Sequence, residues 1–159
     1  MITDRDMMRT LTKLAAGAVV LLALAGCSND PKSGISALEA PAGSADTFPG
    51  DAEAAENLGI APDSTRLLVE ESEYALYAAR PNPTDKDLNT LPADGVCLVV
   101  VHHLEGEQMS SSCRGNWALG PVELGGMGVK AKLTADDYDA SEELSDGWRQ
   151  PHKNLLVRP

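Results

Sequence analysis

Apolar and polar positions divide the chain into an apolar leader, a polar linker and a segment with the periodicity of β strands. Residues 14–26 (LAAGAVVLLALAG) are uncharged and rich in Leu, Ala and Val. Residues 28–48 are dense in Ser, Pro, Gly, Ala and Asp without a sustained apolar period, which is typical of a flexible linker. The pattern therefore predicts a leader over residues 1–26, a flexible linker over 27–50 and one small folded domain over 51–159.

The domain is expected to consist mainly of short antiparallel strands. A helix is expected first, with Asp51 as its N-cap and Gly59 just past its end. The fold class predicted is a small antiparallel β sandwich or partly open barrel with one or two short helices. The expected elements are a helix at 51–58, strands at 66–71, 74–80, 96–103, 122–124 and 129–133, a terminal strand at 154–158 on a sheet edge, a polar loop at 81–92 and an acidic loop with at most one helical turn at 136–148.

The strongest strand pattern, residues 96–103 (VCLVVVHH), also contains one of the three cysteines. It is apolar on both faces, as expected of a strand covered on each side. Cys97 and Cys113 are sixteen residues apart and lie equally far from Glu105 on either side. A turn near Glu105 would place them opposite one another on adjacent strands, where an oxidising compartment allows a disulfide. A cross-link closing a loop of this length stabilises a domain by about 3 kcal/mol.

The N-terminal leader has the order of a secretory signal. Arg5, Arg9 and Lys13 come before the apolar stretch. As a helix, residues 14–26 would cover only about 20 Å, less than the roughly 30 Å that a permanent span must cross. The stretch is therefore expected to be a cleaved signal segment rather than a membrane span.

The leader ends in Leu24-Ala25-Gly26-Cys27, which resembles the lipobox of bacterial lipoprotein precursors. Leu24 occupies the branched apolar position, Ala25 and Gly26 the small positions, and Cys27 the position of the modified thiol. The resemblance implies that a signal peptidase cuts between Gly26 and Cys27 and that Cys27 carries lipid. It also implies a membrane partner and a place at the outer face of the cytoplasmic membrane. With Cys27 assigned to lipid, Cys97 and Cys113 remain as one pair, in agreement with their spacing.

The net charge argues against nucleic acid as a partner. The chain carries −11 at pH 7, and loss of residues 1–26 removes three basic and two acidic residues, leaving a charge near −12 from 10 basic and 22 acidic residues. Such a charge repels phosphate groups and anionic lipid headgroups. Membrane attachment is therefore expected through the lipid alone.

Candidate catalytic and metal-binding residues are few. His102 and His103 end the strongest strand and Ser110, Ser111 and Ser112 follow, but no nucleophile-elbow motif surrounds these serines. A metal site built from Cys97, His102, His103 and Cys113 lacks the close paired spacing of zinc sites. Six carboxylates in the acidic stretch could attract calcium, yet their spacing does not match an EF-hand: Asp136, Asp137, Asp139, Glu142, Glu143 and Asp146. No cofactor is expected.

The domain is also similar to small exported proteins of actinobacterial type, a resemblance that implies no activity. It rests on the runs at 77–80, 97–100 and 154–157. The leading hypothesis is a non-enzymatic binding or structural module that faces an envelope or extracellular protein. The alternative is an exported hydrolase, or an inhibitor of one, that uses the histidine and serine neighbourhood or the loop at 81–92.

Overall fold

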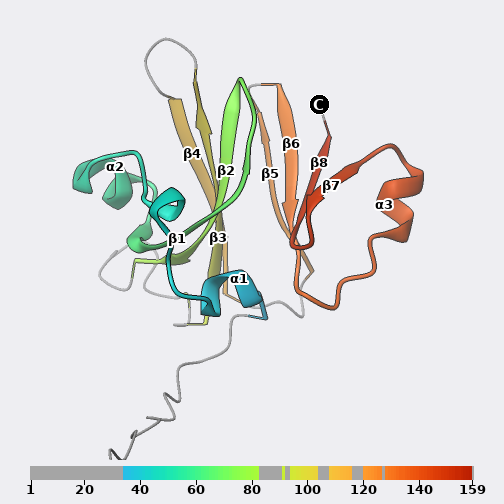
Figure 1. Ribbon diagram of the computed structural model, residues 1–159, viewed down its shortest axis with the longest axis horizontal. Coiled ribbons are helices and arrows are strands. Elements are labelled where there is room, and N and C mark those ends of the chain that lie inside the picture. The colour runs from blue at the N-terminus through green and yellow to red at the C-terminus, as the bar shows by residue number, and fades with distance from the viewer. Residues whose placement is uncertain are drawn as a thin grey trace, which may run out of the picture.

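The computed structural model describes residues 34–82, 91, 94–103, 108–115, 120–126 and 128–158. Within these residues, eight strands form two four-stranded antiparallel sheets (Figure 1). The strands are β1 (Ile60–Glu70), β2 (Tyr74–Pro81), β3 (Val96–His102), β4 (Gln108–Arg114), β5 (Val122–Gly126), β6 (Val129–Leu133), β7 (Arg149–His152) and β8 (Leu155–Arg158). The helical elements are α1 (Ser36–Glu39), the 3-10 turn η1 (Ser44–Asp46), α2 (Ala52–Asn57) and α3 (Ser141–Ser145). The predicted mainly β fold, a small antiparallel sandwich, is confirmed.

The first sheet has the order β1-β2-β3-β4, so each strand pairs with its neighbour in sequence. β2 and β3 pair without a register shift, and so do β3 and β4. The expected hairpin of β1 and β2 is confirmed, although β1 begins earlier than its apolar run because residues 60–65 also pair or extend along β2.

The second sheet has the order β5-β6-β8-β7, which corrects one expectation. The terminal strand β8 was expected at an edge but lies between β6 and β7. The edge strand β7 has the sequence RQPH, with no apolar alternation to reveal it. It forms because a tight turn at Lys153 and Asn154 reverses the chain, so that β7 lies antiparallel to β8.

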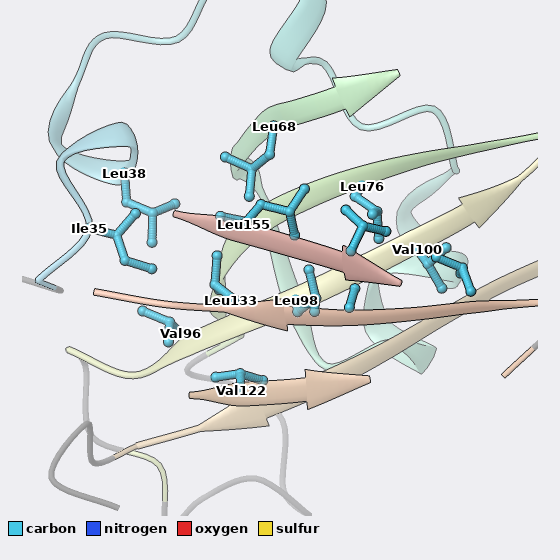
Figure 2. Close-up of a cluster of buried hydrophobic side chains, with 14 residues drawn as sticks. Ile35, Leu38, Leu68, Leu76, Val96, Leu98, Val100, Val122, Leu133 and Leu155 are labelled. Carbon is cyan, nitrogen blue, oxygen red and sulfur yellow. The ribbon is translucent and has the colours of Figure 1, made fainter. Parts of the chain in front are cut away.

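The core has two layers, one on each face of the first sheet. All seven residues of β3 are buried, as its two-sided apolar pattern predicts. Leu98 and Val100 face the second sheet, where they pack with Leu133 and Leu155 (Figure 2). The opposite face of β3 carries Cys97, Val99 and Val101, which pack with a smaller cluster that includes Phe48, Ala55 and Ile60.

The segment preceding residue 51 is part of the domain, so the prediction of a flexible linker over 27–50 is wrong for its described part, residues 34–50. Ile35 is fully buried, and Leu38 and Phe48 are 5% and 7% exposed. Figure 2 shows Ile35 and Leu38 beside core side chains of both sheets. These apolar residues are single and irregularly spaced, so they produce no period, yet each fills a gap left by the sheets. The carboxylate of Asp46 also accepts a hydrogen bond from the Leu67 amide at 2.8 Å.

The short helix α2 matches its prediction. The Asp51 side chain accepts a hydrogen bond from the Ala54 amide at 2.8 Å, as an N-cap should. Gly59 has φ 66°, the left-handed conformation that glycine adopts without strain at the end of a helix. Ala55 is buried against the outer face of the first sheet, which supplies the packing that a helix of this length needs.

Candidate functional site

The two cysteines expected to pair are bonded. Cys97 of β3 lies directly opposite Cys113 of β4, with a Cα–Cα distance of 4.0 Å and an S–S distance of 2.02 Å. Cys97 is fully buried and Cys113 is partly exposed, on the outer face of the first sheet. The predicted disulfide is therefore present, and it joins a central strand to an edge strand. The turn predicted near Glu105 lies outside the described residues.

The histidines and serines do not form a catalytic arrangement in the described residues. His102 is 2% exposed, and its Nε2 atom has no hydrogen-bond partner among the described residues. Its ring packs against Tyr74, with the ring centroids 6.3 Å apart. His103 Nε2 instead lies 3.2 Å from a carboxylate oxygen of Glu70. The Ser111 hydroxyl donates to the Leu58 carbonyl at 2.6 Å, so it supports α2 rather than a histidine.

Most of the acidic stretch is engaged by protein groups rather than arranged around an ion. Glu143 lies 3.1 Å from Lys132 Nζ, and Asp146 lies 2.9 Å from Arg158. Asp139 accepts hydrogen bonds from Ser141. Among the residues that the structure describes, no group of three or more His, Cys, Asp or Glu side chains is placed to hold a metal ion.

Lys132 organises this acidic stretch from β6. Its ammonium group lies between Glu143 and Glu123 and 4.9 Å from the ring centre of Trp148. Burial lowers the pKa of Lys132, but the hydrogen bond to Glu143 and the nearby charge of Glu123 outweigh it and raise the pKa overall. Lys132 therefore stays charged and holds the segment around α3 against the second sheet, a structural role.

A polar cluster fixes the point at which the described chain enters the domain. The Asp136 carboxylate accepts hydrogen bonds from the Ser36 amide at 3.0 Å and from Asn154 Nδ2 at 2.8 Å, and it lies 3.2 Å from Lys153 Nζ. The Asp136 amide donates to the Gly34 carbonyl at 2.9 Å. Although partial burial raises the pKa of Asp136, the hydrogen bonds from Asn154 and Ser36 outweigh it and lower that pKa to about 2. At neutral pH a charged carboxylate therefore pins residues 34–36 to the second sheet.

An open hollow of about 560 Å³ lies between the α2 region and β4. Met109 is the contribution of β4, and the other lining residues come from residues 49–58. The Leu58 carbonyl is tied to Ser111 of β4, so the end of α2 is held over this strand. Figure 1 shows α2 beside β4 at one end of the first sheet. The lining residues are Pro49, Gly50, Asp51, Ala54, Asn57, Leu58 and Met109.

No protein-family model, curated protein or solved structure matches this chain. No helix within the described part of the chain is long and apolar enough to cross a membrane.

Two candidate sites from the sequence lie wholly or mainly outside the described residues. Gly26 and Cys27 are among the residues that are not described, and so are most positions of the loop at 81–92. The sequence did not single out the hollow beside β4. Its lining residues come from the end of the expected linker, a helix and a strand, and no spacing rule connects them.

Proposed function

We propose that this chain is an exported bacterial lipoprotein that is held at the outer face of the cytoplasmic membrane by lipid on Cys27. Its β sandwich then serves as a binding module for an envelope or extracellular protein. The observation that carries the proposal is the assignment of the three thiols. The Cys97–Cys113 disulfide uses two of them, which leaves Cys27 as the one remaining cysteine of the sequence, at the end of a lipobox-like leader.

The disulfide supports export independently of the leader. Structural disulfides persist in oxidising compartments and are rare in the cytosol of most organisms. Both sulfur atoms lie in or beside a packed cluster, and the bond links two strands whose register is continuous. A stable cross-link at this position is consistent with a domain that works outside the cytoplasm.

The polar cluster at Asp136 supports presentation close to a membrane. Ser36, whose amide is bonded to Asp136, is nine residues beyond Cys27. Covalent geometry limits nine residues to a reach of about 30 Å. Lipid on Cys27 would therefore hold the sandwich near the headgroups, with the second sheet carrying the attachment point.

Metabolic labelling with radioactive palmitate tests the lipid anchor. The full chain is expressed in a bacterium that processes lipoproteins, as wild type and as Cys27→Ala. The wild type is expected to incorporate label and to sediment with membranes, and Cys27→Ala is expected to do neither. Equal incorporation by both chains would overturn the proposal.

A variant lacking both other cysteines serves as the matched control. Cys97→Ala combined with Cys113→Ala removes two thiols and leaves the lipobox intact. It should incorporate palmitate as the wild type does. If only this variant lost the label, the lipid would be on Cys97 or Cys113 and not on Cys27.

A further inference from the structure

The four edge strands of the sandwich differ in how well they are protected against pairing with another strand. Edge strands are commonly blocked by proline, bulges, charges or short length. β1 contains Pro62 and two register shifts. β7 contains Pro151, has four residues and has a register shift. β5 has five residues and ends in two glycines.

The edge strand β4 has almost none of these features. Its seven residues, QMSSSCR, pair with β3 in one continuous register. It contains no proline or lysine, and its one charged residue is Arg114 at the end. β4 is therefore the straight, polar and uninterrupted edge of the described sandwich.

The disulfide reveals which backbone groups of β4 point away from β3. Opposed residues in an antiparallel pair lie about 5.5 Å apart when they bond to each other and about 4.5 Å apart when they do not. The 4.0 Å Cα–Cα distance between Cys97 and Cys113 identifies a pair of the second kind. By alternation, Cys113, Ser111 and Met109 direct their N–H and C=O groups outward. No described residue bonds to these outward groups.

The hollow beside α2 lies along this same edge. Met109 belongs to β4 and also lines the hollow, and the bond from Ser111 to Leu58 fixes the helix end above the strand. A strand added to β4 would place alternate side chains on the α2 side of the sheet. One of these would enter the hollow against Met109, Leu58 and Ala54. This combination of an open strand edge and an adjoining side-chain pocket is what strand addition requires.

Charge decides between a partner segment and a second copy of this chain. The chain carries a net charge of −11, which includes Asp51, Glu53 and Glu56 in the α2 region, and the helix itself has no basic residue. Two copies meeting at this edge would bring these like charges together. A neutral or basic segment would be attracted instead.

We infer that β4 accepts an extended, uncharged or basic segment of a partner protein as a fifth strand, with one apolar side chain in the hollow beside Met109. The inference names the class of partner for the binding role proposed above and rests on that role for its biological setting. The binding chemistry itself needs only the folded domain.

The test uses the full chain as the cell produces it, and labelled synthetic heptapeptides as probes. The peptides alternate Val or Leu with Thr or Lys, and a matched set carries Glu in place of Lys. Fluorescence anisotropy measures Kd, and NMR hydrogen exchange follows the amides of Met109, Ser111 and Cys113. The Lys peptides are expected to bind more tightly than the Glu peptides and to slow exchange at these three amides.

A pair of substitutions at Ser111 isolates the backbone contribution. Ser111→Ala and Ser111→Pro both remove the hydroxyl that supports Leu58, but only proline removes the outward N–H. Because a hydrogen bond contributes about 1 kcal/mol, Kd should rise roughly fivefold to tenfold for Ser111→Pro relative to Ser111→Ala. Equal Kd values in two folded variants would overturn the inference.

A second variant keeps the test decisive if Ser111→Pro fails to fold. Asn57 is exposed and lines the hollow, so Asn57→Trp should fill it without disturbing the core. Binding of the Lys peptides should be lost, while circular dichroism stays unchanged. Unchanged binding, binding to no peptide, or dimerisation of the chain through β4 in sedimentation velocity would each overturn the inference. Palmitate labelling of the same preparation reports separately on the lipid anchor, so the two proposals can fail independently.

Discussion

Replacing both cysteines of the disulfide by alanine should destabilise the domain by about 3 kcal/mol. The bond closes a segment of 16 residues, and its loss restores the conformational freedom of that segment in the unfolded chain. The β3–β4 ladder should survive, because six other residue pairs flank or extend from this position in one register. The loss is therefore expected mainly from the missing cross-link, with a smaller cost from the shortened side chains in the buried cluster.

Thermal unfolding followed by circular dichroism measures this effect. For a domain of this size, 3 kcal/mol corresponds to a fall in Tm of roughly 10 °C. The Tm of the wild type should fall by a similar amount in a strong reductant, and the Tm of the variant should not change with reductant. Cys27→Ala should unfold as the wild type does. A variant Tm within about 2 °C of wild type would refute the reasoning, and so would free thiols at Cys97 and Cys113 in the wild type.

Two further predictions concern the N-terminal part of the domain. Ile35→Ala should lower the free energy of unfolding in urea by about 2 to 4 kcal/mol because Ile35 is fully buried. Substitution of the exposed Ala42 by Ser should change it little. Equal stabilities of the two variants would show that this segment does not pack against the domain. The lowered pKa of Asp136, about 2 against an ordinary 3.8, stabilises the fold above pH 3.8, and this contribution is lost as the pH falls toward 2. Because the Asp136 side chain is 38% exposed, solvent screening reduces this contribution to about 1 kcal/mol. Between pH 5 and pH 2, the free energy of unfolding should therefore fall by about 1 kcal/mol less in Asp136→Asn than in the wild type. Identical pH dependence in the two chains would show that the cluster carries no such linkage.

The sequence predicted the central part of the fold because pattern and packing agree there. The valine-rich β3 is apolar on both faces, and the structure covers both faces. The positions of Cys97 and Cys113 followed from the symmetry of an antiparallel pair about Glu105. Helix α2 followed from Asp51 and Gly59, because capping is local chemistry that a short segment reveals by itself.

Elements that depend on distant partners were missed. Ile35, Leu38 and Phe48 are isolated apolar residues in a polar segment, and only the assembled sheets show the gaps that they fill. The strand β7 exists because a turn aligns it with β8, although its own sequence has little strand character. The cluster around Asp136 joins residues a hundred positions apart in sequence, and no local pattern indicates it.

The open edge at β4 belongs to the same class of property. The sequence QMSSSCR has no distinctive alternation, and it becomes a strand because β3 provides a template for every one of its residues. An edge strand can accept a partner only if nothing in it blocks further pairing. Pro62 blocks β1 and Pro151 blocks β7, whereas β4 contains no proline. The proposed binding edge is therefore recognised by comparing the edge strands of the folded domain, and no sequence motif within β4 reveals it. A single proline at Ser111 would give β4 the protection that Pro62 gives β1 and Pro151 gives β7, so that substitution tests whether the exposed β4 edge binds a partner strand.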